Sequence, residues 1–223
     1  MNTGLNLRIT PRTVQQQTIE KLRLAIIAGV FPPGSRLIES QLCAQLGVSR
    51  PSLREALRSL QAERLIEIIP NRGPFVPKLS WEEATEIYDV RELLEVVAVG
   101  RCAVRITPQQ VKELEKALDA FERAQEIGDS LERVTTAADF YAIILANCGN
   151  AILEEVHRGL VARISFFRGR SMSLAGRAQD SLNEMRAIYN AIAAGDEEGA
   201  RKAAKHHLDQ AKAAAKRAIE DEA

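Results

Sequence analysis

Hydrophobic positions in the first third of the chain recur at steps of three and four residues, which is the spacing of a helix with one buried face. This spacing predicts helices over residues 13–29, 39–46 and 49–62. Phe31-Pro32-Pro33-Gly34 stops the first helix, and Gly47 ends the second because a residue without a Cβ can reverse the chain in the left-handed conformation. The residues expected on the buried faces of the first and third helices are Ile19, Leu22, Ile26, Val30, Leu53, Ala56, Leu57 and Leu60.

After the third helix the hydrophobic spacing changes to alternate positions, which is typical of a strand. Residues 65–70 and 74–77 alternate in this way, and Asn71-Arg72-Gly73 between them has the composition of a turn. The pattern predicts a small β-hairpin. Three short helices with a glycine turn before the last, followed by a hairpin, outline a winged helix-turn-helix.

The remainder of the chain, from Ser80 onward, carries only helical spacing. Caps and breaks such as Thr107-Pro108 and Gly128-Asp129 divide it into about six helices. We predict a mainly α protein with two domains, a winged helix-turn-helix over residues 1–78 and an all-helical bundle over residues 79–223. The helices expected in the bundle span residues 81–105, 108–127, 131–147, 151–170, 180–194 and 196–219.

The composition supports a helical protein of 223 residues, since 46% of the residues are hydrophobic but only 4% are aromatic. No stretch approaches the roughly 20 apolar residues that a membrane span needs, and residues 1–12 have no apolar core followed by a cleavage site. Cys43, Cys102 and Cys148 lie far apart without a CxxC pair, which suits packed thiols in a reducing compartment. We expect a cytoplasmic protein without a membrane partner.

The net charge of zero is the sum of two unequal parts. Residues 1–78 hold 11 Lys and Arg against 5 Asp and Glu, a net charge of +6. Residues 79–223 hold 19 against 25, a net charge of −6. A basic first third joined to an acidic remainder indicates a module that binds a polyanion, attached to a domain with a different task.

The third predicted helix carries arginines on one face. Arg50, Arg54 and Arg58 are four residues apart, which keeps them within about 80° of arc, and the apolar face is centred about 110° away. An α-helix fits the major groove of DNA, where arginine reads guanine and grips nearby phosphates. Three arginines alone could also be an ordinary solvated stripe, but together with the glycine turn and the hairpin they favour contact with DNA.

A longer motif runs through the same segment and carries a family resemblance. It reads Glu39-Ser40-Gln41-Leu42, Leu46-Gly47-Val48-Ser49-Arg50-Pro51 and Leu53-Arg54-Glu55-Ala56-Leu57-Arg58-Ser59-Leu60. Pro33-Gly34-Ser35-Arg36-Leu37 and Pro70-Asn71-Arg72-Gly73-Pro74-Phe75-Val76 complete it. Over about residues 14–78 this set is similar to the winged helix-turn-helix of GntR-family bacterial transcription regulators.

The resemblance implies that Arg50 and Arg54 contact DNA from the recognition helix, and that Arg72 and Gly73 reach the minor groove from the tip of the wing. Ser40 departs from the pattern, because many relatives carry arginine there, and the contact of that arginine is not expected here. The full set of expected DNA-binding residues is Ser49, Arg50, Ser52, Arg54, Arg58, Arg36, Arg72 and Gly73.

The helical remainder resembles the FadR-type effector domain of the same family, called FCD, over residues 91–95, 140–150 and 191–208. Many such domains hold a metal ion through an aspartate and a histidine four residues apart on one helix and two histidines on later helices. The positions that correspond to these ligands here are Ala137, Tyr141, Met185 and His207.

Of these four residues only His207 is a usual metal ligand, because alanine has no donor atom and a thioether is a soft ligand. His206 is its neighbour on a helix, about 100° away, and cannot point at the same ion. Asp139 could substitute by a local shift, which leaves a residual site around Asp139 and His207 as an alternative. We predict no metal and no other cofactor.

An acidic effector held without a metal needs another counter-charge, and arginine binds a carboxylate through two parallel hydrogen bonds. Arg91 and Arg163 lie on helices expected to line a cavity, with Tyr141 and Asn150 as hydrogen-bonding neighbours, although each arginine could instead form a surface ion pair. His157 is expected at the surface or at an interface. The expected effector-binding set is Arg91, Tyr141, Asn150, Arg163, Met185 and His207.

The chain has no HExxH, no G-x-S-x-G and no glycine-rich phosphate loop, so it is not expected to be an enzyme. We predict a homodimeric, sequence-specific transcription regulator whose affinity for a double-stranded DNA operator changes when a small, organic acid-like metabolite binds the helical domain. The proline-rich connection over residues 71–79 is expected to transmit this change. The alternative is a DNA-binding dimer without an effector, in which the helical domain serves only dimerisation or protein contacts.

Overall fold

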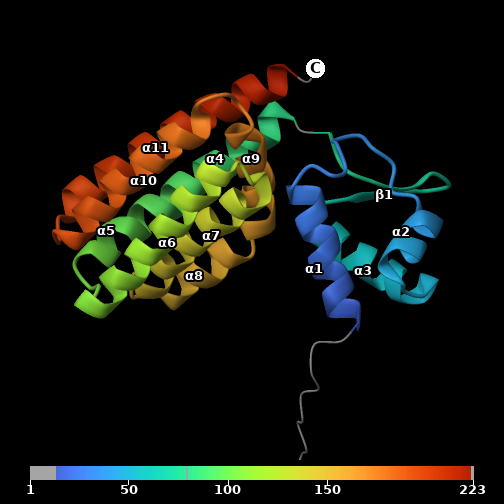
Figure 1. Ribbon diagram of the computed structural model, residues 1–223, viewed down its shortest axis with the longest axis horizontal. Coiled ribbons are helices and arrows are strands. Elements are labelled where there is room, and N and C mark those ends of the chain that lie inside the picture. The colour runs from blue at the N-terminus through green and yellow to red at the C-terminus, as the bar shows by residue number, and fades with distance from the viewer. Residues whose placement is uncertain (1–13, 79, 222–223) are drawn as a thin grey trace, which may run out of the picture.

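The computed structural model describes residues 14–78 and 80–221, which form a small winged helix and a larger helical bundle side by side (Figure 1). The predictions for residues 1–12 and for Leu79 lie outside this described part. The mainly α fold with a two-stranded wing is confirmed. The winged helix consists of α1 (Val14–Ile27), α2 (Glu39–Leu46), α3 (Arg50–Ala62), β1 (Glu67–Ile69) and β2 (Gly73–Phe75).

The start of α3 is fixed by a capping serine and a glycine turn. Gly47 ends α2 in the left-handed conformation, with φ 65° and ψ 33°, and its N–H donates to the carbonyl of Cys43. The Ser49 hydroxyl then accepts a hydrogen bond from the backbone N–H of Ser52 at 3.3 Å, which satisfies a donor that the helix start leaves free. The predicted apolar face of α3 is confirmed, since Leu53, Ala56, Leu57 and Leu60 are buried in one core with Leu22 and Ile26 of α1.

The wing is a short antiparallel hairpin in which Glu67 lies opposite Phe75 and Ile69 opposite Gly73. At its tip Asn71 has a φ of 60° and Gly73 a φ of 88°. Glycine and asparagine tolerate this backbone region best, which explains why the predicted turn forms here. Phe75 also forms a β-bridge with Arg36, which ties the segment before α2 to the wing.

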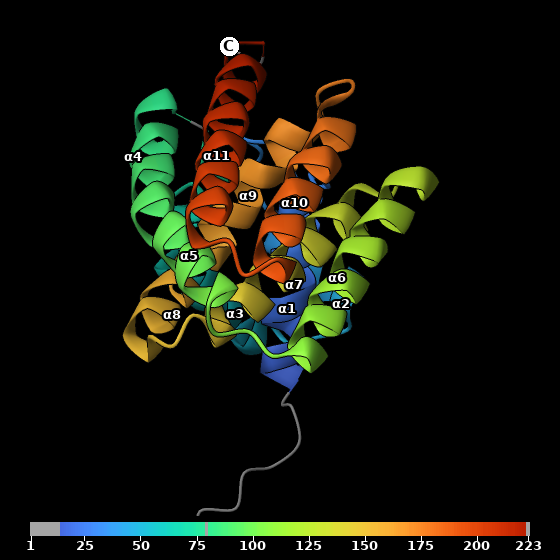
Figure 2. The same ribbon diagram turned by 90° about the vertical axis from the view of Figure 1, so that its left-hand side faces the viewer.

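The helical bundle is built from antiparallel neighbours joined by short, capped loops. Figure 2 shows α10 beside α11 and α6 beside α7, and these pairs make close contacts. Within the described ranges, no helix has both the length and the hydropathy to cross a lipid bilayer. The elements are α4 (Trp81–Arg91), the π-helical turn η1 (Glu92–Val96), α5 (Val97–Ala103), α6 (Pro108–Ile127), α7 (Ser130–Asn147), α8 (Ala151–Arg158), α9 (Val161–Met172), α10 (Arg177–Ala193) and α11 (Glu197–Glu220).

Three predictions about the helices and their buried faces differ from the structure. The single helix expected over residues 151–170 is two helices, α8 and α9, because Gly159 and Leu160 form a turn between them. The helix expected over residues 81–105 is continuous but is widened in its middle by η1. Val30 was expected on a buried face and is 65% exposed, because α1 ends at Ile27 and Gly29 turns the chain with a φ of 77°.

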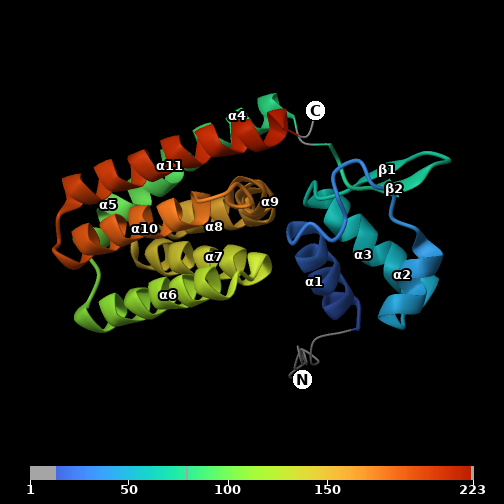
Figure 3. The same ribbon diagram turned by 45° about the horizontal axis from the view of Figure 1, so that its top comes forward.

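The winged helix packs against α9 of the bundle, which lies next to α1 (Figure 3). Phe166 of α9 is 5% exposed and belongs to the core of the winged helix rather than to that of the bundle. A Cβ added to Gly169 would lie 2.9 Å from the carbonyl oxygen of Ile27, so α9 and the end of α1 meet at backbone distance. One helix of the bundle therefore positions the winged helix.

Candidate DNA-binding face and effector site

The surface of α3 carries the three arginines that the sequence predicted. Arg50, Arg54 and Arg58 are exposed and line a shallow hollow together with Ser52 and with Gln15 of α1. The opposite face of α3 is buried in the domain core. This division leaves the guanidinium groups free to contact a groove of DNA while the domain stays folded.

Two arginines of this face, Arg54 and Arg58, form exposed ion pairs. Arg54 Nε lies 3.0 Å from Glu39 Oε2, and 63% of the Arg54 side chain is exposed. Arg58 Nη1 lies 2.7 Å from Glu55 Oε1, and 69% of its side chain is exposed. Exposed pairs of this kind contribute about 0–1 kcal/mol, so a phosphate or a base edge can replace either carboxylate with little loss of stability.

The wing brings two further arginines together. The guanidinium carbon of Arg72 lies 5.2 Å from the centroid of the Phe75 ring, within the range of a cation–π contact. A Cβ built on Gly73 would lie 3.9 Å from Arg36 Nη2, so these two residues are neighbours. The expected DNA-binding residues therefore form two groups, one at the start of α3 and one at the wing.

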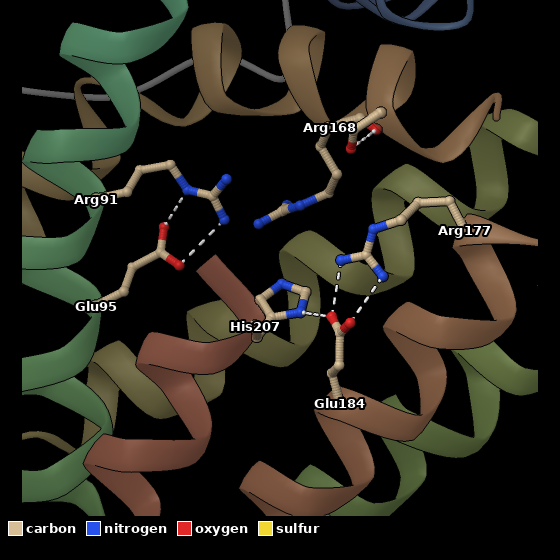
Figure 4. Close-up of polar contacts among 7 residues, drawn as sticks. Arg91, Glu95, Arg168, Arg177, Glu184 and His207 are labelled. Carbon is tan, nitrogen blue, oxygen red and sulfur yellow. Dashed lines mark hydrogen bonds and ion pairs between the residues drawn. The ribbon is translucent and has the colours of Figure 1, made fainter. Parts of the chain in front are cut away.

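A second polar site lies inside the bundle, where side chains of α4, η1, α9, α10 and α11 converge (Figure 4). Arg91 of α4 donates two hydrogen bonds to Glu95 of η1, from Nε to Oε1 at 2.8 Å and from Nη2 to Oε2 at 3.2 Å. Both side chains are fully buried. Glu95 Oε1 also lies 3.1 Å from Nε2 of His157, so this carboxylate has two partners of its own.

Glu184 of α10 organises the other side of this buried cluster. Arg177 donates to its two carboxylate oxygens from Nη1 at 3.0 Å and from Nη2 at 2.7 Å. Nδ1 of His207, on α11, lies 2.7 Å from Glu184 Oε2. Arg177 and His207 are both buried. The second carboxylate of the cluster is thus also held by two partners.

Arg168 of α9 points into the cluster between these two groups (Figure 4). Arg168 is 4% exposed, its guanidinium carbon lies 5.3 Å from the centroid of the Tyr141 ring, and its Nη2 has no hydrogen-bond partner among the described residues. In the part of the chain that the structure describes, no carboxylate forms an ion pair with Arg168. The cluster is made of Arg91, Arg168, Arg177, Glu95 and Glu184, with His157 and His207, and its three arginines and two glutamates leave a surplus of one positive charge.

Burial and neighbouring charges set the ionisation of the cluster. Burial lowers the pKa of Arg168, and the charge of Arg91 lowers it further. Burial also lowers the pKa of His207 despite its hydrogen bond to Glu184, so this imidazole is neutral near pH 7. Burial acts to raise the pKa of Glu95 and of Glu184, but the contacts of Glu95 with Arg91 and His157 and those of Glu184 with His207 and Arg177 outweigh burial and lower both pKa values. The two carboxylates therefore stay ionised, and the surplus positive charge persists at neutral pH.

The structure brings some of the expected effector residues to this cluster. Arg91 and His207 belong to it, and Tyr141 and Met185 lie in the bundle core that borders it. Asn150 does not, because it is exposed and caps α8 by accepting a hydrogen bond from the N–H of Leu153 at 3.1 Å.

Arg163 and His157 also differ from the expectation. Arg163 Nη2 pairs with Glu83 Oε1 at 2.5 Å, beside a surface groove next to the wing. It lies five residues before Arg168, which is about 140° around the helix, so the two side chains cannot share a site. The prediction of a surface or interfacial His157 is wrong, since this residue is 3% exposed and its ring contacts Glu95.

Sequence reasoning missed Glu95, Arg168, Arg177 and Glu184. Arg91 and Glu95 are four residues apart, and Arg177 and Glu184 are seven apart, so each pair shares one helix face and could have been proposed as an ion pair. Arg168 follows the apolar pair Phe166-Phe167, which is the only local signal that its side chain is buried.

The four residues at the family's metal-ligand positions do not fit a metal ion. Ala137 offers no donor atom and Met185 offers only a soft thioether, so His207 is the one usual metal ligand among the four. The cationic Arg168 lies against the ring of Tyr141, where it would repel a metal ion. Across residues 14–78 and 80–221, no group of three or more His, Cys, Asp and Glu side chains is placed to hold a metal.

The alternative of a residual metal site around Asp139 and His207 also finds no support in the geometry. Asp139 lines a hollow on the outer side of α7 and α8 with Arg158 and His157. His207 instead bonds to Glu184 inside the buried cluster.

Comparison with known families matches both parts of the fold. Residues 14–76 match the family described as bacterial regulatory proteins, gntR family, and residues 86–210 match the FCD domain. The HTH-type transcriptional regulator McbR of Escherichia coli strain K12 is 32% identical over 152 residues, which are 68% of this chain and 68% of that protein. The probable D-xylose utilization operon transcriptional repressor of Paenarthrobacter nicotinovorans is 28% identical over 201 residues, covering 90% and 88% of the two chains.

Solved structures agree with these matches. The structure of E. coli McbR/YncC superposes with a TM-score of 0.79 at 27% identity and covers 92% of this chain and 98% of that one. A GntR regulator from Rhodococcus sp. RHA1 gives a TM-score of 0.75 at 28% identity and covers 89% and 95%. The chain therefore belongs to the GntR family of bacterial transcription regulators, in which the winged helix is joined to an FCD domain, and it is not an enzyme.

Proposed function

We propose that this regulator binds a specific double-stranded operator through α3 and the wing, and that a small anionic metabolite bound in the helical domain changes its operator affinity. The observation that carries the proposal is the exposed arginine face of α3. Arginine is the commonest side chain for reading guanine in the major groove, and it also grips phosphates. The net charge of +6 over residues 1–78 adds an attraction that does not depend on sequence.

In this proposal Arg50 and Arg54 contact base edges, because the first residues of a recognition helix lie deepest in the major groove. The hydroxyls of Ser49 and Ser52 lie 2.9 Å apart beside them and can turn toward a phosphate. The remaining contacts are proposed for Arg58 on α3 and for Arg36, Arg72 and Gly73 at the wing, which would approach the minor groove.

The buried charged cluster supports an anionic effector. A buried charge is unfavourable unless an opposite charge or hydrogen bonds compensate it. The surplus positive charge of the cluster has no such compensation, and an anion that enters the bundle would neutralise it. No metal and no other cofactor is part of this proposal.

The helix α9 offers a route from the effector to the winged helix. It carries Arg168 in the cluster, Phe166 in the core of the winged helix and Gly169 against α1. A ligand changes operator affinity only as far as it binds two arrangements of the domains unequally, and such coupling is typically about 1–3 kcal/mol. The chain segment over residues 71–79 also joins the two domains, so it is proposed as a second path by which effector binding reaches the winged helix.

We further propose that the protein acts as a homodimer. One short recognition helix reaches only a few base pairs, whereas a two-fold pair on adjacent half-sites doubles the contacts. Light scattering that gives a monomer at micromolar concentration, together with protection of a single half-site in footprinting, would exclude this arrangement.

Operator binding is tested with duplexes selected from random sequence by the full chain. Fluorescence anisotropy then compares wild-type protein with the Arg50→Ala/Arg54→Ala double variant and with Arg123→Ala, an exposed arginine of α6 in the helical domain. We expect the double variant to lose specific binding and the control to keep it, with affinity falling steeply as salt rises. Unchanged operator affinity in a folded double variant would overturn the proposal.

A further inference from the structure

Arg168 is the least compensated charge in the buried cluster. Its side chain is buried, its guanidinium lies on the Tyr141 ring, and its Nη2 donates to no acceptor among residues 14–78 and 80–221. Native proteins satisfy the great majority of their buried polar groups. A buried guanidinium without an acceptor therefore points to an anion that binds here.

The two carboxylates of the cluster are not available to Arg168. Glu95 is held by Arg91 and His157, and Glu184 is held by Arg177 and His207. If either carboxylate moved to Arg168, another buried arginine would lose its partner. The missing acceptor must therefore come from outside the protein.

Further unpaired donors lie in the same region. The hydroxyls of Tyr88 and Tyr141 are buried and have no hydrogen-bond partner within the described part of the chain. The Arg168 guanidinium lies over the ring of Tyr141, and the guanidinium carbon of Arg91 lies 4.9 Å from the centroid of the Tyr88 ring. A hydroxyl donates a hydrogen bond to an anion as readily as to a carbonyl group, so these tyrosines complete a set of donors.

We propose that Arg168 binds the anionic head of the effector directly, as a fixed cation in place of the metal ion used by many FCD domains, and that this head is a carboxylate with a single negative charge. The inference rests on the proposed function, because it names the ligand class of the effector site. Arginine and carboxylate match in geometry through two parallel hydrogen bonds.

The charge count selects a monocarboxylate. Three arginines and two glutamates leave one positive charge, which one carboxylate neutralises. A dicarboxylate or a phosphate monoester brings about two negative charges at neutral pH and would leave one of them buried and unpaired. Met185 and Ala137, which lie in the adjoining apolar core, add no charge to this count.

The test uses the full chain in EDTA and follows its melting temperature, because a ligand that binds only the folded state raises it. The probes are the sodium salts of formate, acetate, propionate, butyrate and benzoate at about 10 mM, matched in ionic strength with sodium chloride. The corresponding primary amides test the need for the charge, and disodium succinate tests the limit of one charge. We expect at least one monocarboxylate to raise the melting temperature, and its amide and succinate to have no effect.

Two variants on α9 test whether the melting-temperature response to a carboxylate depends on Arg168. Arg168→Met removes the charge and keeps much of the volume, and it should weaken carboxylate binding by roughly tenfold or more. Arg163→Met is the matched control, because this arginine pairs with Glu83 outside the cluster, and the response should persist in it.

Ligand-free stability gives a readout that does not depend on the choice of probe. Arg168→Met loses an unpaired buried charge and should melt at or above the temperature of wild-type protein, whereas Arg91→Met leaves Glu95 without its main partner and should melt lower. The inference is overturned if both variants are destabilised alike, if no monocarboxylate acts, if succinate acts as well as they do, or if the response requires added zinc or manganese.

A carboxylate response that survives in Arg168→Met would overturn only this assignment, since the effector would then bind elsewhere in the chain. A response that depends on Arg168 but leaves operator affinity unchanged would support the site and contradict its role in the proposed function. The two failures are therefore distinguishable.

Discussion

Phe166 and Arg168 lie two residues apart on α9 and are buried in different domains. Phe166 packs in the core of the winged helix, whereas the guanidinium of Arg168 lies against Tyr141 in the bundle. Positions two apart differ by about 200° around a helix, so α9 presents opposite faces to the two domains. A shift of this helix at Arg168 therefore also moves the residue that seats the winged helix.

Replacing Phe166 with alanine should uncouple the two domains. Truncating a buried phenylalanine typically removes about 3–5 kcal/mol of stability, and less where the neighbouring residues can close the space. We expect operator affinity in Phe166→Ala to become insensitive to a carboxylate that still raises the melting temperature of the protein. Operator binding by fluorescence anisotropy, with and without the ligand, measures the loss.

The matched control for this variant is Phe167→Ala. Phe167 is also buried, but it packs with Tyr88 and Ala215 inside the helical domain and not in the winged helix. Equal loss of coupling in both variants would mean that general destabilisation, and not the Phe166 contact, is responsible.

Gly169→Ala should disturb the contact between α9 and α1. The added Cβ would lie 2.9 Å from the carbonyl oxygen of Ile27, which belongs to the backbone and cannot rotate away as a side chain can. Overpacking of this kind typically removes about 1–3 kcal/mol of stability. We expect a lower melting temperature and faster proteolysis between the domains. Gly159→Ala is the control, since its Cβ would lie at a tolerable 3.4 Å from the carbonyl oxygen of Val156.

Local signals were enough to predict the winged helix. Ser49, Gly47 and the apolar positions of α3 act within a few residues, so the sequence contains both the start of the helix and the direction of its buried face. The break between α8 and α9 also has a local signal, because Gly159 follows the basic residues His157 and Arg158, and the prediction of one helix over residues 151–170 overlooked it.

The effector site was predicted less well because it is made by tertiary packing. Periodicity places Arg163 and Arg168 on one helix but does not show which of them faces the bundle. Once α8 and α9 are separate helices, the rotation of α9 differs from that of a continuous helix. Arg168 then faces inward and Arg163 faces Glu83.

Arg54→Ala should weaken binding to a selected operator by about 1–3 kcal/mol if this arginine reads a base. Its partner Glu39 offers a further check, because Glu39→Ala removes a carboxylate that competes with DNA for the Arg54 guanidinium. We expect Glu39→Ala to bind DNA at least as tightly as wild-type protein. Titrations with the operator and with a scrambled duplex separate base reading by Arg54 from attraction to DNA of any sequence. Weaker DNA binding by Glu39→Ala would contradict the competition between Glu39 and DNA for Arg54.

The buried cluster should make the protein less stable as the pH falls. The pKa of His207 is lowered in the folded state, so below its ordinary value of 6.5 the unfolded chain takes up a proton that the folded chain does not. Glu95 and Glu184 also have lowered pKa values and add a second loss below about pH 4.5. Asp139 acts in the opposite direction, because burial raises its pKa, but it is one partly buried group against three.

Urea denaturation at a series of pH values from neutral to acidic measures this dependence as the free energy of unfolding. Wild-type protein should lose stability first as the pH passes below about 6.5 and again below about 4.5. In His207→Gln the first loss should disappear and the second should remain, because Glu184 keeps Arg177 as a partner. A wild-type stability that rises between neutral pH and pH 5 would contradict the neutral, buried state of His207.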